Sequence, residues 1–459
     1  MSIQSISLRP RLPLRVILKD ILGGCAASVL TITFGLSYSL LIFGGPLSPY
    51  LGYGVAATFL SSAILAGVIA VGSSLPFAIA GPESSTAAMI GILSSSMVER
   101  IVKADPSAPL LMPVLLTLAL ATVLTGIVLC CFGMTRIGRA IRYVPYPVVG
   151  GFLAATGCLI LFGAVRVITG QPLQFATLGR FVDIHVLSKL AAACAMALVL
   201  YLTWHRSRSS FGLPVILVGG VIAAHILFWL AGVSPTEAQA AGWTFQSPSK
   251  VTLISPWSLA ALQHYPWHIL TEISGNLIAV IFVTASCALF NTTGLEVATN
   301  REANLERELN VTGLANILSG AFGGYTGCIS TSRSTLNFNS GGTGPLAGLT
   351  VAAISLLMLA FAPELLGYMP KFVLGGLLIY LGADQLHKWI VQSRSRLSRT
   401  EYLSLLAIIV IIVQWGFIPG ILIGVVIGCA TFAFSASRID SIKFSFDGSE
   451  YRSSLDRSR

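Results

Sequence analysis

Long apolar runs recur along the whole chain and constrain its fold more than any other feature. The first covers residues 21–43 and the last residues 417–435, and 54% of the 459 residues are hydrophobic whereas 10% are charged. A helix of about 20 apolar residues crosses the hydrocarbon of a bilayer. Backbone groups in lipid must be hydrogen-bonded within a segment, and the runs lack the alternation of barrel strands. The pattern therefore predicts an all-α polytopic membrane protein.

The apolar runs divide into fourteen predicted transmembrane segments. Some of them are too short to cross a bilayer alone. The segments begin near residues 21, 52, 81, 109, 140, 186, 213, 268, 311, 331, 345, 370, 402 and 417.

Lysine and arginine are divided unequally between the two predicted sides of the membrane. Of the 28, 20 fall on the side of the N-terminus, seven fall on the other side, and Arg333 lies within a span. By the positive-inside rule both termini are cytoplasmic, including a short N-terminal segment at 1–20. We expect an integral protein of a bacterial inner membrane, in contact with the lipid bilayer. The net charge of +10 then needs no nucleic acid as a partner.

Two polar stretches interrupt the apolar sequence at corresponding places in the two halves. Residues 74–96 and 323–348 each follow two predicted spans and contain a short extended lead, a glycine and a hydroxyl cluster that opens a short helix. Paired interruptions of this kind are typical of inverted-repeat transporters. Three elements later, 142–157 and 367–382 share a proline and a Gly-Gly pair in register. We therefore predict a 7+7 inverted repeat in which half-helices 3 and 10 meet at the midplane.

Half-helices that begin near the midplane create a site for a small anion. Their first backbone N–H groups lack partners, and their dipoles present positive ends. Arg333 adds a positive charge with no acid beside it in the sequence, and serine and threonine hydroxyls can donate to an oxyanion. The alternative for each hydroxyl is a bond to a nearby carbonyl or a neighbouring helix. The hydroxyls concerned are Ser84, Ser85 and Thr86 in the first stretch, and Ser330, Thr331 and Ser332 in the second.

At these residues the chain resembles the SulP family, the sulfate permease group of anion transporters. The matching pieces are GPESSTAAM from residue 81, NREANLERELNVTGLANILSGAFGG from 300, STSRSTLNFNSGGTGPLAG from 330 and SASRIDSIKFSFDGSEYRSS from 435. The resemblance covers essentially the whole chain. It implies the fourteen-helix fold shared with uracil permeases, in a protein that is usually a homodimer.

The resemblance also implies a division of the chain. A transmembrane transport domain would cover 21–437. Its core would contain helices 1–4 and 8–11, at about 21–132 and 268–362, and its gate helices 5–7 and 12–14, at about 138–232 and 370–437. Residues 438–459 would form a linker stub towards a STAS domain that this sequence does not include.

Family roles can be carried to individual positions. Thr331, Ser332 and Arg333 match the substrate-contacting start of helix 10, and Ser84 to Thr86 match that of helix 3. The family lines its cavity with helix 1, where Phe34 and Tyr38 lie four residues apart on one face. The alternative for these two aromatic side chains is packing against lipid or core.

Helix 8 departs from the family pattern. Several bacterial members coordinate sodium through an acid on this helix, and alignment through the NREANLEREL segment places Cys287 there, with Asn291 one turn later. A cysteine cannot replace a carboxylate, because hard cations need oxygen ligands. We therefore expect transport that does not depend on sodium, and no resident metal ion.

Glu83 occupies the place of a common threonine in the family, beside the predicted anion site. A carboxylate buried there can hold a proton and carry it with the substrate. The alternative is a structural acid that pairs with a basic group or with the backbone. Glu296 is a second candidate proton carrier, although its place near the cytoplasmic end also fits a solvated role.

The leading functional hypothesis is secondary transport of a small inorganic or carboxylate anion by alternating access, as proton-linked symport or anion exchange. Sulfate, bicarbonate, chloride and dicarboxylates all fit such a site. A channel or voltage-responsive protein on the same fold is the main alternative, and Arg333 argues against a neutral nucleobase. The six histidines are dispersed, and no acid-rich motif occurs, so we expect neither an enzyme nor a cofactor.

Overall fold

A computed structural model describes residues 14–430 except 136–145, 172, 174–178, 180, 207–210, 246–254, 417–418, 421, 425 and 429. Within these residues seven helices are long and apolar enough to cross a membrane. They are α1 (Leu14–Ile42), α2 (Leu51–Gly72) with the preceding 3₁₀ turn η1 (Gly45–Tyr50), α4 (Leu111–Thr135), α5 (Tyr146–Thr169), α6 (Ile184–Arg206), α7 (Gly212–Leu230) and α11 (Ser274–Thr299).

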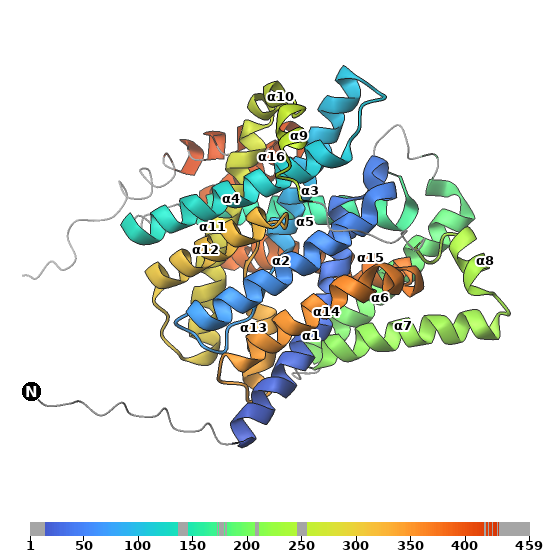
Figure 1. The fold of residues 1–459 in the computed structure, drawn as a ribbon, viewed down its shortest axis with the longest axis horizontal. Helices are drawn as coiled ribbons and strands as arrows, with labels where there is room; N and C mark the ends of the chain where they lie inside the picture. Colours follow the sequence, from blue (N-terminus) through green and yellow to red (C-terminus); the bar gives the residue numbers. More distant parts are fainter. Residues whose placement is uncertain are drawn as a thin grey trace, which may run out of the picture.

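Further named helices lie between and after these seven (Figure 1). They are α3 (Ser84–Ala104), α8 (Pro235–Ala240), α9 (Leu259–Gln263), α10 (Trp267–Glu272), α12 (Leu305–Ala321), α13 (Thr331–Asn339), α14 (Leu346–Tyr368), α15 (Lys371–Leu386) and α16 (Arg399–Trp415). After α15 the chain continues as a π-helical turn, η4 (His387–Val391), and a 3₁₀ turn, η5 (Gln392–Ser395). The predicted helical class is confirmed, whereas the fourteen-span inverted repeat stays a prediction.

The two helices that follow the polar stretches, α3 and α13, differ in length from each other. The sequence predicted helices too short to cross a bilayer after both polar stretches. This holds for α13, which has 9 residues, but is wrong for α3, which has 21. The last turns of α3 contain polar residues such as Glu99 and Lys103. The helix is therefore long enough to span a membrane but is not among the seven apolar candidates. Residues 1–13 of the predicted N-terminal segment at 1–20, and the whole predicted linker stub at 438–459, lie outside the described residues.

Helices from the two halves of the sequence pack against one another. α12 lies against α4 and α2, α14 against α1 and α2, and α15 against α5 and α6. The α4–α12 contact depends on Gly126 and Gly313: a Cβ on Gly126 would lie 2.5 Å from the Gly313 carbonyl oxygen, and one on Gly313 would lie 2.7 Å from the Gly126 carbonyl oxygen. Small residues of this kind let membrane helices approach closely.

A two-residue antiparallel ladder joins the two polar stretches. β1 (Ala80–Gly81) pairs with β2 (Cys328–Ile329), with Ala80 opposite Ile329 and Gly81 opposite Cys328. These short strands are the extended leads expected from the sequence. Because α3 begins three residues after β1 and α13 two residues after β2, the ladder brings the N-termini of both helices together.

Buried carboxylates hold two of the loops. Asp20 is 1% exposed, and its Oδ1 accepts hydrogen bonds from the backbone N–H groups of Thr343 (2.8 Å) and Gly344 (3.0 Å), just before α14. Glu308 is also buried and accepts bonds from the hydroxyls of Ser73 and Ser74 after α2. These acids are structural, because each binds backbone or hydroxyl donors of a loop through its carboxylate.

Candidate functional site

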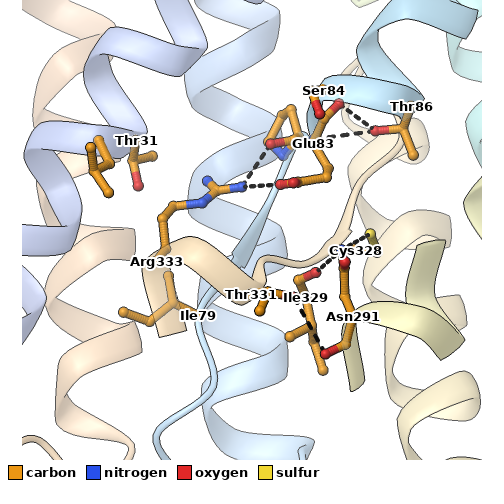
Figure 2. A network of polar contacts seen from close by, with 12 residues as sticks. Thr31, Ile79, Glu83, Ser84, Thr86, Asn291, Cys328, Ile329, Thr331 and Arg333 are labelled. Atoms are coloured by element: carbon orange, nitrogen blue, oxygen red, sulfur yellow. Dashed lines mark hydrogen bonds and ion pairs between the residues drawn. The ribbon is translucent and has the colours of Figure 1, made fainter. Parts of the chain in front are cut away.

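The N-termini of α3 and α13 form the centre of the candidate site. Glu83 is the N-cap of α3 and Ser330 that of α13, and both have extended backbone. Arg333 extends from the first turn of α13 towards the residues that precede α3 (Figure 2). Two helix starts and one guanidinium therefore converge on one region of the core.

Arg333 is bound to the start of α3. Its Nη2 donates to the Pro82 carbonyl at 2.7 Å and lies 3.4 Å from Glu83 Oε2, as Figure 2 shows. The Arg333 side chain is 1% exposed and that of Glu83 18%. Gly81 makes room for this arrangement, since a Cβ there would lie 2.6 Å from Arg333 Nη1.

Arg333 has no acid beside it in the sequence, but Glu83, which was predicted beside the anion site, lies next to it in the fold from 250 positions away. This contact is the one that the structural alternative for Glu83, an acid that pairs with a basic group, requires. The β1–β2 ladder sets the two side by side. With both groups ionised, the formal charges of the site cancel, and a bound anion meets a carboxylate as well as a guanidinium.

The predicted hydroxyls have different environments. The Thr86 hydroxyl caps the N-terminus of its own helix. Its Oγ1 accepts a hydrogen bond from the Glu83 N–H at 3.2 Å and donates one to the Glu83 carbonyl at 2.9 Å. Thr331 donates to the Asn291 carbonyl at 3.4 Å. Ser332 is exposed, whereas the Oγ of Ser330 is buried without a protein partner. The N-cap hydroxyl of α13, that of Ser330, therefore remains open to a ligand.

Ser84 and Ser85 contact helices from another part of the chain. Gln385 at the end of α15 donates through Nε2 to Ser85 Oγ at 2.8 Å and to Ser84 Oγ at 3.4 Å. Thr156 of α5 donates to Ser85 at 3.5 Å. Sequence reasoning missed Gln385 and Thr156. The available signal for Gln385 was the polar pair Asp384–Gln385 directly after the apolar segment that begins at Phe372.

Phe34 and Tyr38 are buried rather than lipid-facing. They are 3% and 1% exposed, and their ring centroids lie 6.0 Å apart. The Tyr38 hydroxyl has no hydrogen-bond partner among the described residues, and Ser84, Glu83 and Arg333 lie near it. Besides the hydroxyls of Ser330 and Tyr38, the Nε of Arg333 is a buried polar atom of the site without a described partner. Buried polar groups normally have partners, so these atoms indicate room for a solute or water at the site.

Of the candidate residues on α11, Asn291 stabilises the segment that leads into α13. Asn291 donates through Nδ2 to the Ile329 carbonyl at 2.8 Å (Figure 2). Cys287 is 5% exposed and lies one turn earlier. Glu296 accepts from the Ala303 N–H at 2.8 Å and so stabilises the turn after α11. No group of three or more histidine, cysteine, aspartate or glutamate side chains suited to a metal occurs among the described residues.

A family model described as the sulfate permease family matches residues 17–411. The chain belongs to this family. The predicted resemblance is thus confirmed, and the family and its named relatives are transporters rather than enzymes.

Two curated relatives illustrate the range of the family. The vacuolar basic amino acid transporter VSB1 of Saccharomyces cerevisiae is 22% identical over 441 residues, which is 94% of this chain and 42% of that protein. The bicarbonate transporter BicA of Synechocystis is 24% identical over 347 residues, 73% of this chain and 58% of that protein. The chain spans about half the length of such relatives.

Solved structures share the fold. The transmembrane domain of a cyanobacterial bicarbonate transporter, BicA, aligns with a TM-score of 0.68 at 20% identity, over 91% of this chain and 99% of that one. SLC26A9 aligns with a TM-score of 0.70 at 17% identity, over 96% of this chain and 71% of that one. At this identity the likeness concerns architecture, and the substrate must be argued from the site.

Proposed function

We propose that this chain is the membrane domain of a secondary transporter for a small anion. The observation that carries the proposal is the convergence of two helix N-termini with Arg333 in a buried region. Helix starts and a guanidinium favour an oxyanion, and the free Ser330 hydroxyl can donate to it. The printed names of relatives include sulfate and bicarbonate transporters, and both anions belong to the chemical class that this site fits.

Glu83 makes the proposed transport proton-linked. An ionised carboxylate about 4 Å from an anion repels it by about 4 kcal/mol at an effective dielectric constant near 20. Protonation of Glu83 removes that repulsion and leaves Arg333 free to attract the anion. The proton would then move with the substrate as symport, or return in an exchange cycle.

Alternating access would move the proposed core, at about 21–132 and 268–362, against the proposed gate, at about 138–232 and 370–437. The contacts from Gln385 and Thr156 to Ser85 cross this boundary. They would break and reform during each cycle. We further propose a homodimer in a bacterial inner membrane, with both termini cytoplasmic. Labelling of engineered terminal cysteines in intact cells would test the orientation of the termini.

Uptake into proteoliposomes tests the proposed function. A carrier gives saturable uptake of radiolabelled sulfate, bicarbonate or dicarboxylate, and accelerated uptake when the vesicles are preloaded with the same anion. A channel on the same fold gives conductance without this counterflow. A thermal-shift screen over the same anions identifies the substrate, since a ligand that binds the folded state stabilises it.

A second candidate is transport of a zwitterionic or basic amino acid. The observation that favours it is the pairing of opposite charges at the site, with Arg333 placed to bind a carboxylate and Glu83 to accept an ammonium group. The buried ring of Tyr38 adds a surface for a cation. The relative named as a vacuolar basic amino acid transporter covers 94% of this chain.

Glu83→Gln separates the two candidates, because its effect has opposite signs for them. An anion without an ammonium group binds equally well or better when the carboxylate is replaced by an amide. Arginine or lysine loses its partner and binds at least tenfold more weakly, as expected for a lost charge-assisted hydrogen bond of about 1.5 kcal/mol or more. Competition of each solute against the other in both variants gives the assignment.

A further inference from the structure

A groove lies between α1, α3 and α5. It consists of two adjoining cavities of about 420 and 240 Å³, which share Leu41, Gly91, Ser95 and Arg166. Their other walls are mainly apolar and include Leu159 and Phe162 of α5. The groove therefore combines a long apolar surface with one guanidinium.

Arg166 has few partners in the part of the chain that the structure describes. Its Nη2 donates to the Gly44 carbonyl at 3.2 Å, and no described carboxylate lies within ion-pair distance. Gly45 must be glycine here, since it has a φ of +66° and a Cβ would collide with the guanidinium. The remaining N–H donors of Arg166 face the groove, since Arg166 lines both cavities, and charged groups of membrane-spanning helices commonly face a cavity or a polar partner.

The position of Arg166 along its helix matches the shape of a lipid. It lies in the last turn of α5, whereas Leu159 and Phe162 lie one to two turns deeper. Lys103 and Glu99, at the outer end of α3, line the outer cavity and pair with each other at 2.8 Å. The free charge of the groove is therefore positive and lies where a head group meets its acyl chains.

We propose that this groove binds an anionic glycerophospholipid, with its phosphate on Arg166 and an acyl chain along the apolar walls. A free phosphate ion would leave those walls in contact with water, and a neutral lipid would leave the guanidinium without a counter-charge. Apolar burial and a charge-assisted hydrogen bond together favour an amphiphile that carries both features.

Lipid binding is measured on the purified chain in nanodiscs. Phosphatidylcholine nanodiscs are compared with nanodiscs containing a minority of phosphatidylglycerol, by native mass spectrometry of the retained lipid and by thermal unfolding. We expect the wild type to retain phosphatidylglycerol and to unfold at a higher temperature in its presence. Arg166→Gln should bind it about tenfold more weakly, as expected for a lost charge-assisted hydrogen bond.

Two further variants separate lipid binding from a structural effect of Arg166. Ser95→Phe fills the groove from an exposed position without changing charge and should also lose the lipid. Arg100→Gln removes a charge from α3 outside the groove, at a residue that pairs with Glu272 at 2.7 Å. This variant should retain the lipid.

The proposal is overturned if phosphatidylcholine stabilises the protein as well as phosphatidylglycerol, or if inorganic phosphate alone reproduces the effect. It is equally overturned if Ser95→Phe retains the lipid. If Arg166→Gln does not fold, the response of Ser95→Phe decides. These measurements concern binding, so they are independent of whether the chain transports an anion.

Discussion

Gln385 of α15 donates a 2.8 Å hydrogen bond to the hydroxyl of Ser85 in the first turn of α3. The bond joins two helices that the proposed mechanism separates. We expect Gln385→Leu to favour their separation by about fivefold, since a hydrogen bond contributes about 1 kcal/mol. The readout is maleimide labelling of Cys287, a neighbour of Ser85 that is 5% exposed.

This labelling requires serine at the other cysteines. The rate at Cys287 should rise about fivefold in Gln385→Leu. Gln392→Leu is the matched control, because Gln392 is exposed and near in sequence. Equal labelling rates in both variants would show that the Gln385 bond does not restrain the two helices.

Arg333→Gln should reduce stability as well as anion binding. It leaves Glu83 with less compensation in a largely buried place, and breaking a buried pair costs about 3 kcal/mol. Arg333→Gln combined with Glu83→Gln removes both charges and should recover most of the stability without recovering anion affinity. Thermal unfolding and uptake kinetics measure the two effects. An anion affinity equal to wild type in the double variant would refute the site assignment.

Anion uptake should rise as the external pH falls. Lower pH favours protonated Glu83, which no longer repels the substrate. Glu83→Gln imitates the protonated carboxyl and should flatten the profile of uptake against pH. Glu296→Gln serves as the control, since Glu296 bonds to a turn rather than to Arg333. If the Glu83 variant keeps the wild-type profile, another group carries the proton.

Replacing sodium by potassium or choline should leave uptake unchanged. Cys287 stands where the family places a carboxylate ligand, and a thiol is a poor ligand for a hard cation. Asn291 uses its amide N–H on the Ile329 carbonyl. A steep rise of initial uptake rate with sodium concentration would instead indicate oxygen ligands from Asn291 or from backbone carbonyls.

Asp20→Ala should lower stability by about 3 kcal/mol. The substitution leaves the partly buried N–H groups of Thr343 and Gly344 without their carboxylate acceptor, and each unsatisfied group costs about 1–3 kcal/mol. Asp105→Ala is the control, because Asp105 is exposed and bonds only to Ser107 nearby. Thermal unfolding of both variants tests this. Similar losses in the two would mean that Asp20 does not hold the loop before α14.

The apolar runs by themselves determined the helical class, because a backbone in lipid must satisfy its hydrogen bonds within each segment. The paired polar stretches at 74–96 and 323–348 also indicated where two helices begin together. Motifs such as the one around Arg333 were sufficient for the family, since the order of residues carries that information directly.

The tertiary structure decided which groups meet at the site. Glu83 and Arg333 are 250 positions apart, and the two-residue ladder of β1 and β2 brings them within 3.4 Å. Gln385 and Thr156 reach Ser85 only through the packing of α15 and α5. Local sequence patterns specify the helices, whereas a charge is neutralised by whatever the fold places within a few ångströms. The sequence thus placed Glu83 beside the predicted site, and the fold decides that its partner is Arg333.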